Sequence, residues 1–160
     1  MADTLSTPKP VQGDAPLDAS LFSIVIPINY EDTDAGGIVY YGNYLGYMER
    51  ARNACLRELG FPLGELVNIH KLLFVVADVH IKYRQPARLD DELRITLAIK
   101  RAKGASIEFR QTVLRDTALL VEADLKLAII NSETFKPRKL PGFLKSGLSQ
   151  WMLPDKGSEN

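Results

Sequence analysis

The fold is decided between residues 30 and 44, which read YEDTDAGGIVYYGNY. Before this stretch, residues 21–28 are mostly apolar and β-branched, which predicts a first strand. The polar residues and glycines of 29–37 predict a turn. After Val39, apolar side chains recur at steps of three and four as far as Leu59, which predicts one long amphipathic helix.

The chain beyond this helix has the pattern of an antiparallel sheet. Gly60 and Pro62 predict the end of the helix, and a short helical turn follows over 62–69. Apolar and polar residues then alternate, most regularly over 121–129. The expected strands cover 73–84, 93–100, 107–113 and 121–129. Turns between them allow consecutive strands to pair as antiparallel neighbours.

One strand, one long helix and four strands predict an α+β domain in which the helix lies on the concave face of the sheet. Such a sheet has an uncovered edge, so we expect a dimer formed through strand edges. The predicted domain covers 21–146, with an N-terminal tail over 1–20 and a C-terminal tail over 147–160. A short helix is also expected within 143–151.

The composition excludes several classes of protein. With 20 basic and 20 acidic residues among 160, the chain has no basic excess for binding nucleic acid. No apolar run approaches the roughly 18 residues of a membrane-spanning helix, and residues 1–20 have no secretory signal. The single cysteine, Cys55, cannot form an intramolecular disulfide, which favours the cytoplasm. His70 and His80 are not part of a metal-ligand pattern, so no metal is expected.

The chemistry is expected in the stretch that precedes the long helix. Three carboxylates, including Asp32 and Asp34, come before two glycines and the first helical amides. Those amides have no acceptor within the helix, so they can bind an oxyanion beside a carboxylate. This arrangement is typical of a hydrolase. The alternative is that both aspartates only shape a turn in which Gly36 and Gly37 adopt positive φ.

The run from Asp32 to Arg52, DTDAGGIVYYGNYLGYMERAR, resembles the motif of the 4-hydroxybenzoyl-CoA thioesterase and YbgC-like acyl-CoA thioesterase family. The resemblance continues through 74–111 and 119–141, and it covers roughly Phe22 to Leu144. It implies a hotdog fold, in which an antiparallel sheet of about five strands wraps around one long central helix. It also implies active sites at a homodimer interface, and dimers that pair into a homotetramer.

The resemblance further implies hydrolysis of an acyl-CoA or aroyl-CoA thioester, without a metal or redox cofactor, since coenzyme A is part of the substrate. Asp34 corresponds to the catalytic carboxylate, either as a nucleophile or as a general base for water. The backbone N–H of Tyr41 corresponds to the oxyanion donor. Many YbgC-like members have histidine where this chain has Tyr41, and a tyrosine cannot move protons near neutral pH as histidine does.

Other residues have predicted roles in binding. The candidates for substrate contact are Tyr30, Gly42, Tyr44 and Glu49, although Glu49 can equally form an ion pair on the helix. The expected coenzyme A contacts are Arg101, Lys103 and Ser106 around a glycine turn, with Arg138 and Lys136 as weaker candidates. The same turn can also be a solvated hairpin. The sequence leaves open the acyl group, an acyl-carrier-protein substrate, and a non-catalytic acyl-CoA-binding protein.

Overall fold

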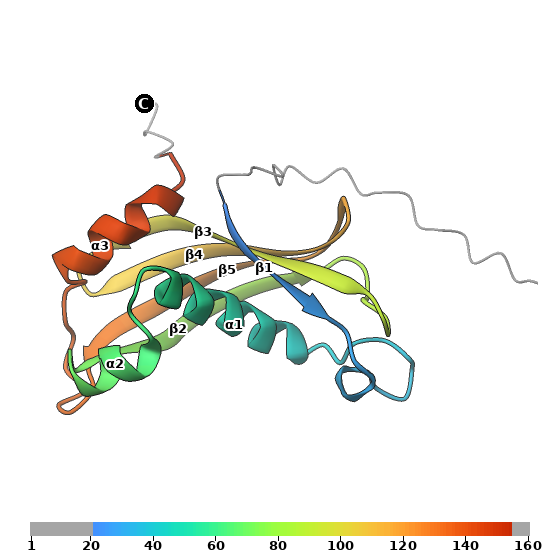
Figure 1. Ribbon diagram of the computed structural model, residues 1–160, viewed down its shortest axis with the longest axis horizontal. Coiled ribbons are helices and arrows are strands. Elements are labelled where there is room, and N and C mark those ends of the chain that lie inside the picture. Colours follow the sequence, from blue (N-terminus) through green and yellow to red (C-terminus); the bar gives the residue numbers. More distant parts are fainter. Residues whose placement is uncertain (1–20, 155–160) are drawn as a thin grey trace, which may run out of the picture.

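The computed structural model describes residues 21–154, so the predicted tail over 1–20 lies outside the described residues. Figure 1 shows a curved sheet with helices on one side of it and at one end. The elements are β1 (Phe22–Pro27), α1 (Asn43–Glu58), α2 (Leu63–Asn68), β2 (Leu72–Tyr83), β3 (Glu92–Lys103), β4 (Ser106–Arg115), β5 (Ala118–Asn131) and α3 (Gly142–Leu148), with short 3-10 helices η1 (Tyr30–Asp32) and η2 (Ser149–Trp151). The strands and helices therefore fall close to the predicted ranges.

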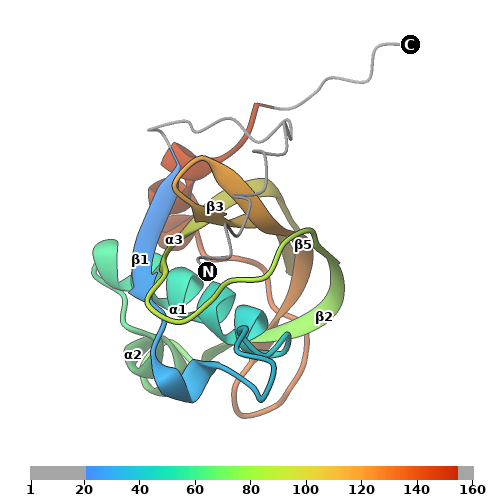
Figure 2. The same cartoon turned by 90° about the vertical axis from the view of Figure 1, so that its right-hand side faces the viewer.

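The five strands form one antiparallel sheet in the order β1-β3-β4-β5-β2. The two predicted hairpins β3–β4 and β4–β5 are confirmed. The expectation that β2 pairs with β3 is wrong, because β2 pairs with β5 at the far edge of the sheet. The connection 84–91 therefore crosses from one edge of the sheet to β3 at the other side, where β3 pairs with β1 (Figure 2).

The sheet curves around α1, as the end-on view in Figure 2 shows. The buried side of α1 follows the predicted spacing, and it includes Tyr47, Met48, Ala51 and Cys55. Burial of this side against apolar strand residues supplies the core. The prediction of a five-stranded antiparallel hotdog sheet agrees with this arrangement. The prediction of a single long helix holds only in part, since α1 has 16 residues and the shorter α2 and α3 accompany it.

The packed part of the chain extends past the predicted boundary at residue 146. Leu148 is 3% exposed and Trp151 is 9% exposed, and both belong to the hydrophobic core. The Trp151 ring meets the Phe22 ring edge-on, with the ring centroids 5.3 Å apart. The N–H of Leu153 donates to the Ile99 carbonyl at 2.7 Å. The end of the described chain thus covers the beginning of β1, and the predicted C-terminal tail begins too early.

The strand register defines two ends of the sheet. Pro27 at the end of β1 pairs with Glu92 at the start of β3, so the β1–α1 connection lies at this end. The β3–β4 turn follows Lys103, which is twelve residues along β3. At about 3.3 Å per residue, the two ends are roughly 35 Å apart. In Figure 1 the β1–α1 loop, in blue to cyan, and the yellow β3–β4 turn lie toward opposite ends of the sheet.

Within 21–154, none of the helices has the length and apolar character needed to cross a membrane.

Candidate functional site

The loop between β1 and α1 is built around Asp32. The Asp32 carboxylate accepts hydrogen bonds from the Asn29 N–H at 2.8 Å and from the Tyr47 hydroxyl at 2.7 Å. The Asp32 carbonyl accepts from the Asn43 side-chain amide at 2.9 Å and from the Tyr40 N–H at 3.1 Å. Burial, with the hydrogen bond to Asp32, raises the pKa of Tyr47. Asp32 therefore fastens the loop to the first turns of α1.

Asp34 lies at the exposed tip of the same loop. One carboxylate oxygen, Oδ1, accepts from the Gly36 N–H at 2.8 Å, and the Asp34 carbonyl accepts from the Gly37 N–H at 3.0 Å. Gly37 has a φ of 76°, which glycine adopts without strain. The predicted turn is thus present. Within 21–154 the other carboxylate oxygen, Oδ2, accepts no hydrogen bond, so the turn leaves it accessible to a ligand.

Two main-chain N–H groups at the start of α1 also have no partner. Within the described chain, neither Tyr41 nor Gly42 donates its N–H to a backbone or side-chain acceptor. Gly42 has an ordinary helical φ of −70°, so its conformation does not require glycine. Its lack of a side chain leaves room for Tyr40, whose ring carbon Cε1 lies 2.8 Å from where a Cβ would be. The predicted oxyanion donor is therefore unoccupied by protein groups.

The crossing connection 84–91 supports this loop from the other side. The Val39 N–H donates to the Ala87 carbonyl at 2.9 Å, and the Ala87 N–H donates to the Tyr44 hydroxyl at 3.0 Å. Tyr44 is 2% exposed, and burial raises its pKa. Its side chain is in the core and not in the pocket lining described below. The predicted contact between Tyr44 and the substrate remains a prediction.

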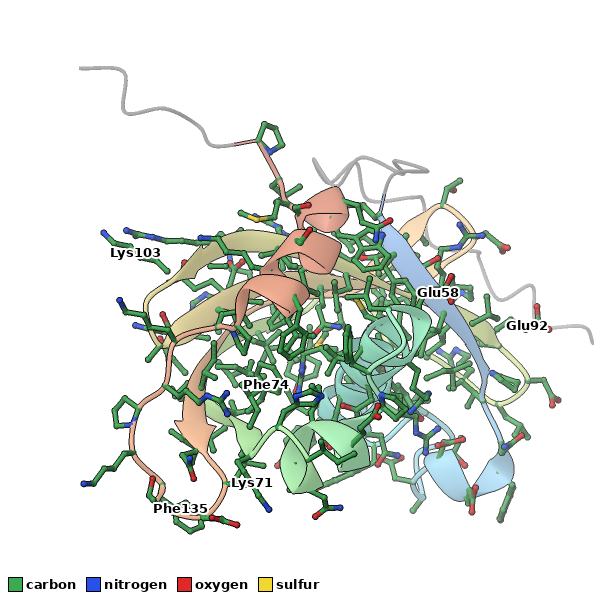
Figure 3. All side chains as sticks on the ribbon, turned by 60° about the vertical axis from the view of Figure 1, so that its left-hand side comes forward. Glu58, Lys71, Phe74, Glu92, Lys103 and Phe135 are labelled. Carbon is green, nitrogen blue, oxygen red and sulfur yellow. The ribbon has the colours of Figure 1, made fainter. Side chains whose placement is uncertain are left out.

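A pocket of about 180 Å³ opens between α1, the sheet and the short helices. Its wall is mainly apolar, and Figure 3 shows Phe74 of this wall between the sheet and the helices. Three polar residues of α1 also line it, namely Glu49, Arg52 and Asn53. The predicted substrate residue Glu49 is thus on a pocket, whereas Tyr30 is 82% exposed and is not part of the pocket lining.

Arg52 is a pocket residue that the sequence reasoning missed. It is 9% exposed, and its Nη1 donates to Gln111 Oε1 at 2.9 Å. Gln111 is fully buried and in turn donates to the Met48 carbonyl at 3.0 Å. Burial lowers the pKa of Arg52, and the Glu49 carboxylate opposes that change. The MERAR run contained Arg52, but helical spacing alone did not distinguish it from the exposed Arg50.

The β3–β4 turn carries the predicted coenzyme A contacts. Lys103 points outward at the end of β3, as Figure 3 shows, and the Ser106 hydroxyl donates to the Lys103 carbonyl at 3.2 Å. The segment after β5 lies alongside, since the Leu140 N–H donates to the Gly104 carbonyl at 3.4 Å. Arg138 comes from this segment, and its guanidinium donates to the His70 carbonyl. Arg101 is exposed on β3 just before the turn.

The structure divides the predicted site between the two ends of the sheet. Asp34, Tyr41 and Gly42 come together at the N-terminal end of α1, whereas Lys103 and Ser106 lie at the opposite end. The pocket is on the side of the β3–β4 turn, since α2, α3 and the start of β2 contribute to its wall. Across 21–154, no cluster of three or more His, Cys, Asp or Glu residues could hold a metal ion.

Comparisons with known proteins identify the family of the chain. Residues 36–122 match the model of the thioesterase superfamily. An acyl-CoA thioesterase YbgC from Haemophilus influenzae is 40% identical, over 78% of this chain and 92% of the relative. An acyl-CoA thioester hydrolase YbgC from Escherichia coli is 37% identical, over 78% of this chain and 93% of the relative.

A solved structure supports the same relationship. The crystal structure of a probable thioesterase from Bartonella henselae aligns with a TM-score of 0.72 at 36% identity, over 76% of this chain and 99% of that chain. The resemblance deduced from the sequence motif is therefore confirmed. The match of more than half of the residues to the family model, together with relatives of this identity and coverage, means that the chain belongs to the thioesterase superfamily.

Proposed function

We propose that the protein hydrolyses an acyl-CoA or aroyl-CoA thioester to the free acid and coenzyme A. The observation that carries the proposal is the pairing of an accessible carboxylate oxygen on Asp34 with the unpartnered N–H groups of Tyr41 and Gly42 on one loop. A hydrolase needs both a group that attacks or activates water and donors for the oxyanion. The acyl-CoA substrate is supported by the names of the relatives at 37–40% identity.

In this proposal the reaction begins when an oxygen nucleophile adds to the thioester carbonyl. Asp34 either attacks the carbonyl itself or removes a proton from the attacking water. The carbonyl oxygen becomes an oxyanion, which the Tyr41 N–H stabilises at the positive end of the α1 dipole. The C–S bond then breaks, and coenzyme A leaves as a thiolate that takes up a proton. If water attacked, the acid forms directly. If Asp34 attacked, an acyl–aspartyl anhydride forms, and water hydrolyses it to release the acid and restore the carboxylate.

The proposal does not require a histidine at position 41. The Tyr41 side chain is 64% exposed, and the proposed donor is its main-chain N–H. Within 21–154, no titratable side chain donates to the Asp34 carboxylate. The protonation of the leaving thiolate is therefore assigned to water in this proposal.

We infer that the working site is shared between two copies of the chain. The Asp34 loop and the pocket beside the β3–β4 turn are at opposite ends of one chain. The edge strand β2 exposes Val75 and Val76, which are 41% and 48% exposed. Antiparallel pairing of two β2 edges about a two-fold axis would bury these valines and bring the pocket of one copy toward the Asp34 loop of the other.

The proposed substrate contacts follow from this pairing. The pocket takes the acyl or aroyl group, because its wall is mostly apolar with Glu49 and Arg52 on one side. Lys103, Ser106, Arg101 and Arg138 contact the nucleotide end of coenzyme A. Within 21–154, Lys103 forms no ion pair, so its charge is available for a phosphate. Pairing of dimers into a tetramer remains a prediction from the resemblance.

A carrier-protein thioester is a second candidate substrate, because the exposed cations Arg101 and Lys103 can also contact an acidic partner. Coenzyme A and the carrier protein share the same thioester chemistry. Comparing turnover of one acyl group on the two carriers decides between them. If kcat/KM is higher with the carrier-protein thioester, that thioester replaces the coenzyme A thioester as the proposed substrate.

The test of the proposed function is the substitution Asp34→Asn. We expect kcat to fall by about 10²- to 10⁴-fold, because the amide can neither attack nor accept a proton. The melting temperature should stay at the parental value, since the turn to Gly36 needs only one oxygen acceptor. The measurement is release of free thiol from short, medium and long acyl-CoAs and from benzoyl-CoA and 4-hydroxybenzoyl-CoA.

The matched control is Asp116→Asn. Asp116 is exposed in the β4–β5 turn with a φ of 52°, a conformation that asparagine also tolerates. This variant should keep parental turnover. Parental turnover by Asp34→Asn would refute the catalytic assignment. Tight binding of acyl-CoA by the parent with no thiol release across the panel would favour a binding protein over an enzyme.

A further inference from the structure

We propose that Tyr83 is a positioning residue that holds the peptide between Tyr41 and Gly42, and with it the Gly42 N–H, in its active orientation. The proposal rests on the proposed function, since it assigns a role within the same site. Tyr83 is the last residue of β2, and its hydroxyl donates to the Tyr41 carbonyl at 3.1 Å. The two residues are 42 positions apart in the chain, so this bond joins the sheet to the site loop.

The hydrogen bond acts on a part of the loop that other bonds do not reach. Tyr40 is held at both ends, because its N–H donates to Asp32 and its carbonyl accepts from the Asn43 N–H at 2.9 Å. The Tyr41 carbonyl accepts only from Tyr83 within the described chain. Rotation about the bonds of Tyr41 would change the peptides on both sides of its Cα. Tyr83 limits the rotation of the planar peptide between Tyr41 and Gly42 and thereby fixes the direction of the Gly42 N–H.

The surroundings of Tyr83 favour a fixed, neutral donor. Its ring packs edge-on against Tyr41, with centroids 6.2 Å apart, and tilted against the buried Tyr44 at 5.7 Å. Partial burial, and to a lesser degree the neighbouring Tyr41, raises the pKa of Tyr83. The phenol therefore keeps its proton at neutral pH and donates a hydrogen bond to the Tyr41 carbonyl. The two ring contacts orient the side chain so that one hydroxyl can hold the loop.

Preorganised donors matter because an oxyanion exists only near the transition state. A displaced N–H group weakens transition-state stabilisation without weakening the binding of the ground-state thioester to the same extent. Loss of the Tyr83 hydroxyl should therefore lower kcat and leave KM nearly unchanged. A residue that served only the stability of the fold would lower the melting temperature and would not separate kcat from KM.

The experiment uses Tyr83→Phe in the full-length chain, which keeps the ring contacts and removes only the hydroxyl. We expect kcat to fall about tenfold, less than the roughly 100-fold or greater loss from deleting an oxyanion donor. KM should stay within about twofold of the parent, and the melting temperature should not change. The matched control is Tyr40→Phe, because within 21–154 the Tyr40 hydroxyl makes no hydrogen bond to the main chain.

A second readout does not depend on turnover. Amide hydrogen exchange of the peptide that contains Tyr41 and Gly42 should be faster in Tyr83→Phe than in the parent and in Tyr40→Phe. Parental kcat together with parental exchange would overturn the positioning role. A fall in kcat that is accompanied by a lower melting temperature would also overturn it, in favour of a structural role.

The two proposals fail in different ways. If Asp34→Asn keeps parental turnover, or if the parent releases no thiol, the proposed function fails, and the exchange measurement still decides whether Tyr83 holds Tyr41. If Asp34→Asn is inactive while Tyr83→Phe matches the parent in both readouts, only the role of Tyr83 fails.

Discussion

The two ends of the sheet differ in how they are held. At the Asp34 end, Asp32, Tyr44, Tyr47 and Tyr83 each contribute a side-chain oxygen to hydrogen bonds that fix the loop. At the other end, Lys103 projects from a two-residue turn without an ion pair among residues 21–154. The pocket beside this turn is lined mostly by apolar side chains.

The difference separates two requirements of an enzyme. Chemistry needs donors and a carboxylate in fixed directions, and a dense set of hydrogen bonds supplies them. Binding of a long, charged substrate needs apolar surface and accessible cations, which tolerate more freedom. The two ends of one chain are roughly 35 Å apart by strand length, and the proposed sharing of a site between two chains would bring them to one substrate.

The largest expected effect comes from mixing two inactive variants. Asp34→Asn removes the carboxylate, and Asn53→Trp fills the pocket, which Asn53 lines. If the loop of one copy works with the pocket of the other, each mixed dimer has one intact site. We expect the mixed dimers of the two variants, each inactive alone, to recover about half of the parental turnover, since one of the two sites in each mixed dimer is intact.

The measurement is thiol release by coexpressed chains with two different affinity tags, purified on both tags in sequence. Each variant purified alone provides the background. An absence of recovery in verified mixed dimers would mean that the loop and the pocket of the same chain work together. The proposal that two chains share one site would then be wrong.

A smaller effect is expected from Asp32→Ala, which should lower stability as well as kcat. The substitution removes both acceptors of the carboxylate and leaves the hydroxyl of the buried Tyr47 without a partner. Loss of these bonds should reduce the free energy of unfolding by about 2–3 kcal/mol. Urea unfolding and kcat, measured beside Asp34→Asn, test this. Unchanged stability would show that Asp32 is not a structural anchor.

The smallest effect is expected at the opposite end. Lys103→Ala should raise KM for acyl-CoA about fivefold and leave kcat and the melting temperature unchanged, because an exposed cation contributes about 1 kcal/mol to binding a phosphate. Added salt should reduce the difference from the parent. Lys126→Ala is the control, since Lys126 is exposed on the inner strand β5. A drop in kcat without a change in KM would contradict the binding role.

Local patterns predicted most of the fold. Alternation over 121–129 and helical spacing after Val39 reflect which side chains face the core, so they identified β5 and α1. The same patterns identified the residues of β2 but not its position in the sheet, because its pairing with β5 depends on the path of the connection 84–91 across the molecule. They also missed the burial of Trp151, which arises from contact with Phe22 at the other end of the chain.

The candidate site was predictable where its residues are adjacent in sequence. Asp34, Tyr41 and Gly42 came from one motif, and the structure brings them together on one loop. The distinct role of Asp32 depends on Tyr47, which is 15 positions further along the chain, and the role proposed for Tyr83 depends on a contact across 42 positions. Such roles follow from packing between distant segments, which spacing along one segment does not encode.

The contact between Trp151 and Phe22 has a consequence for the order in which the molecule can fold during synthesis. A chain leaves the ribosome from its amino end, so β1 emerges long before its partner strand β3. The Trp151 ring that covers Phe22 comes 129 positions later than Phe22. The Phe22 side chain therefore lacks this cover until translation is nearly complete, and a molecular chaperone has that period in which to bind it.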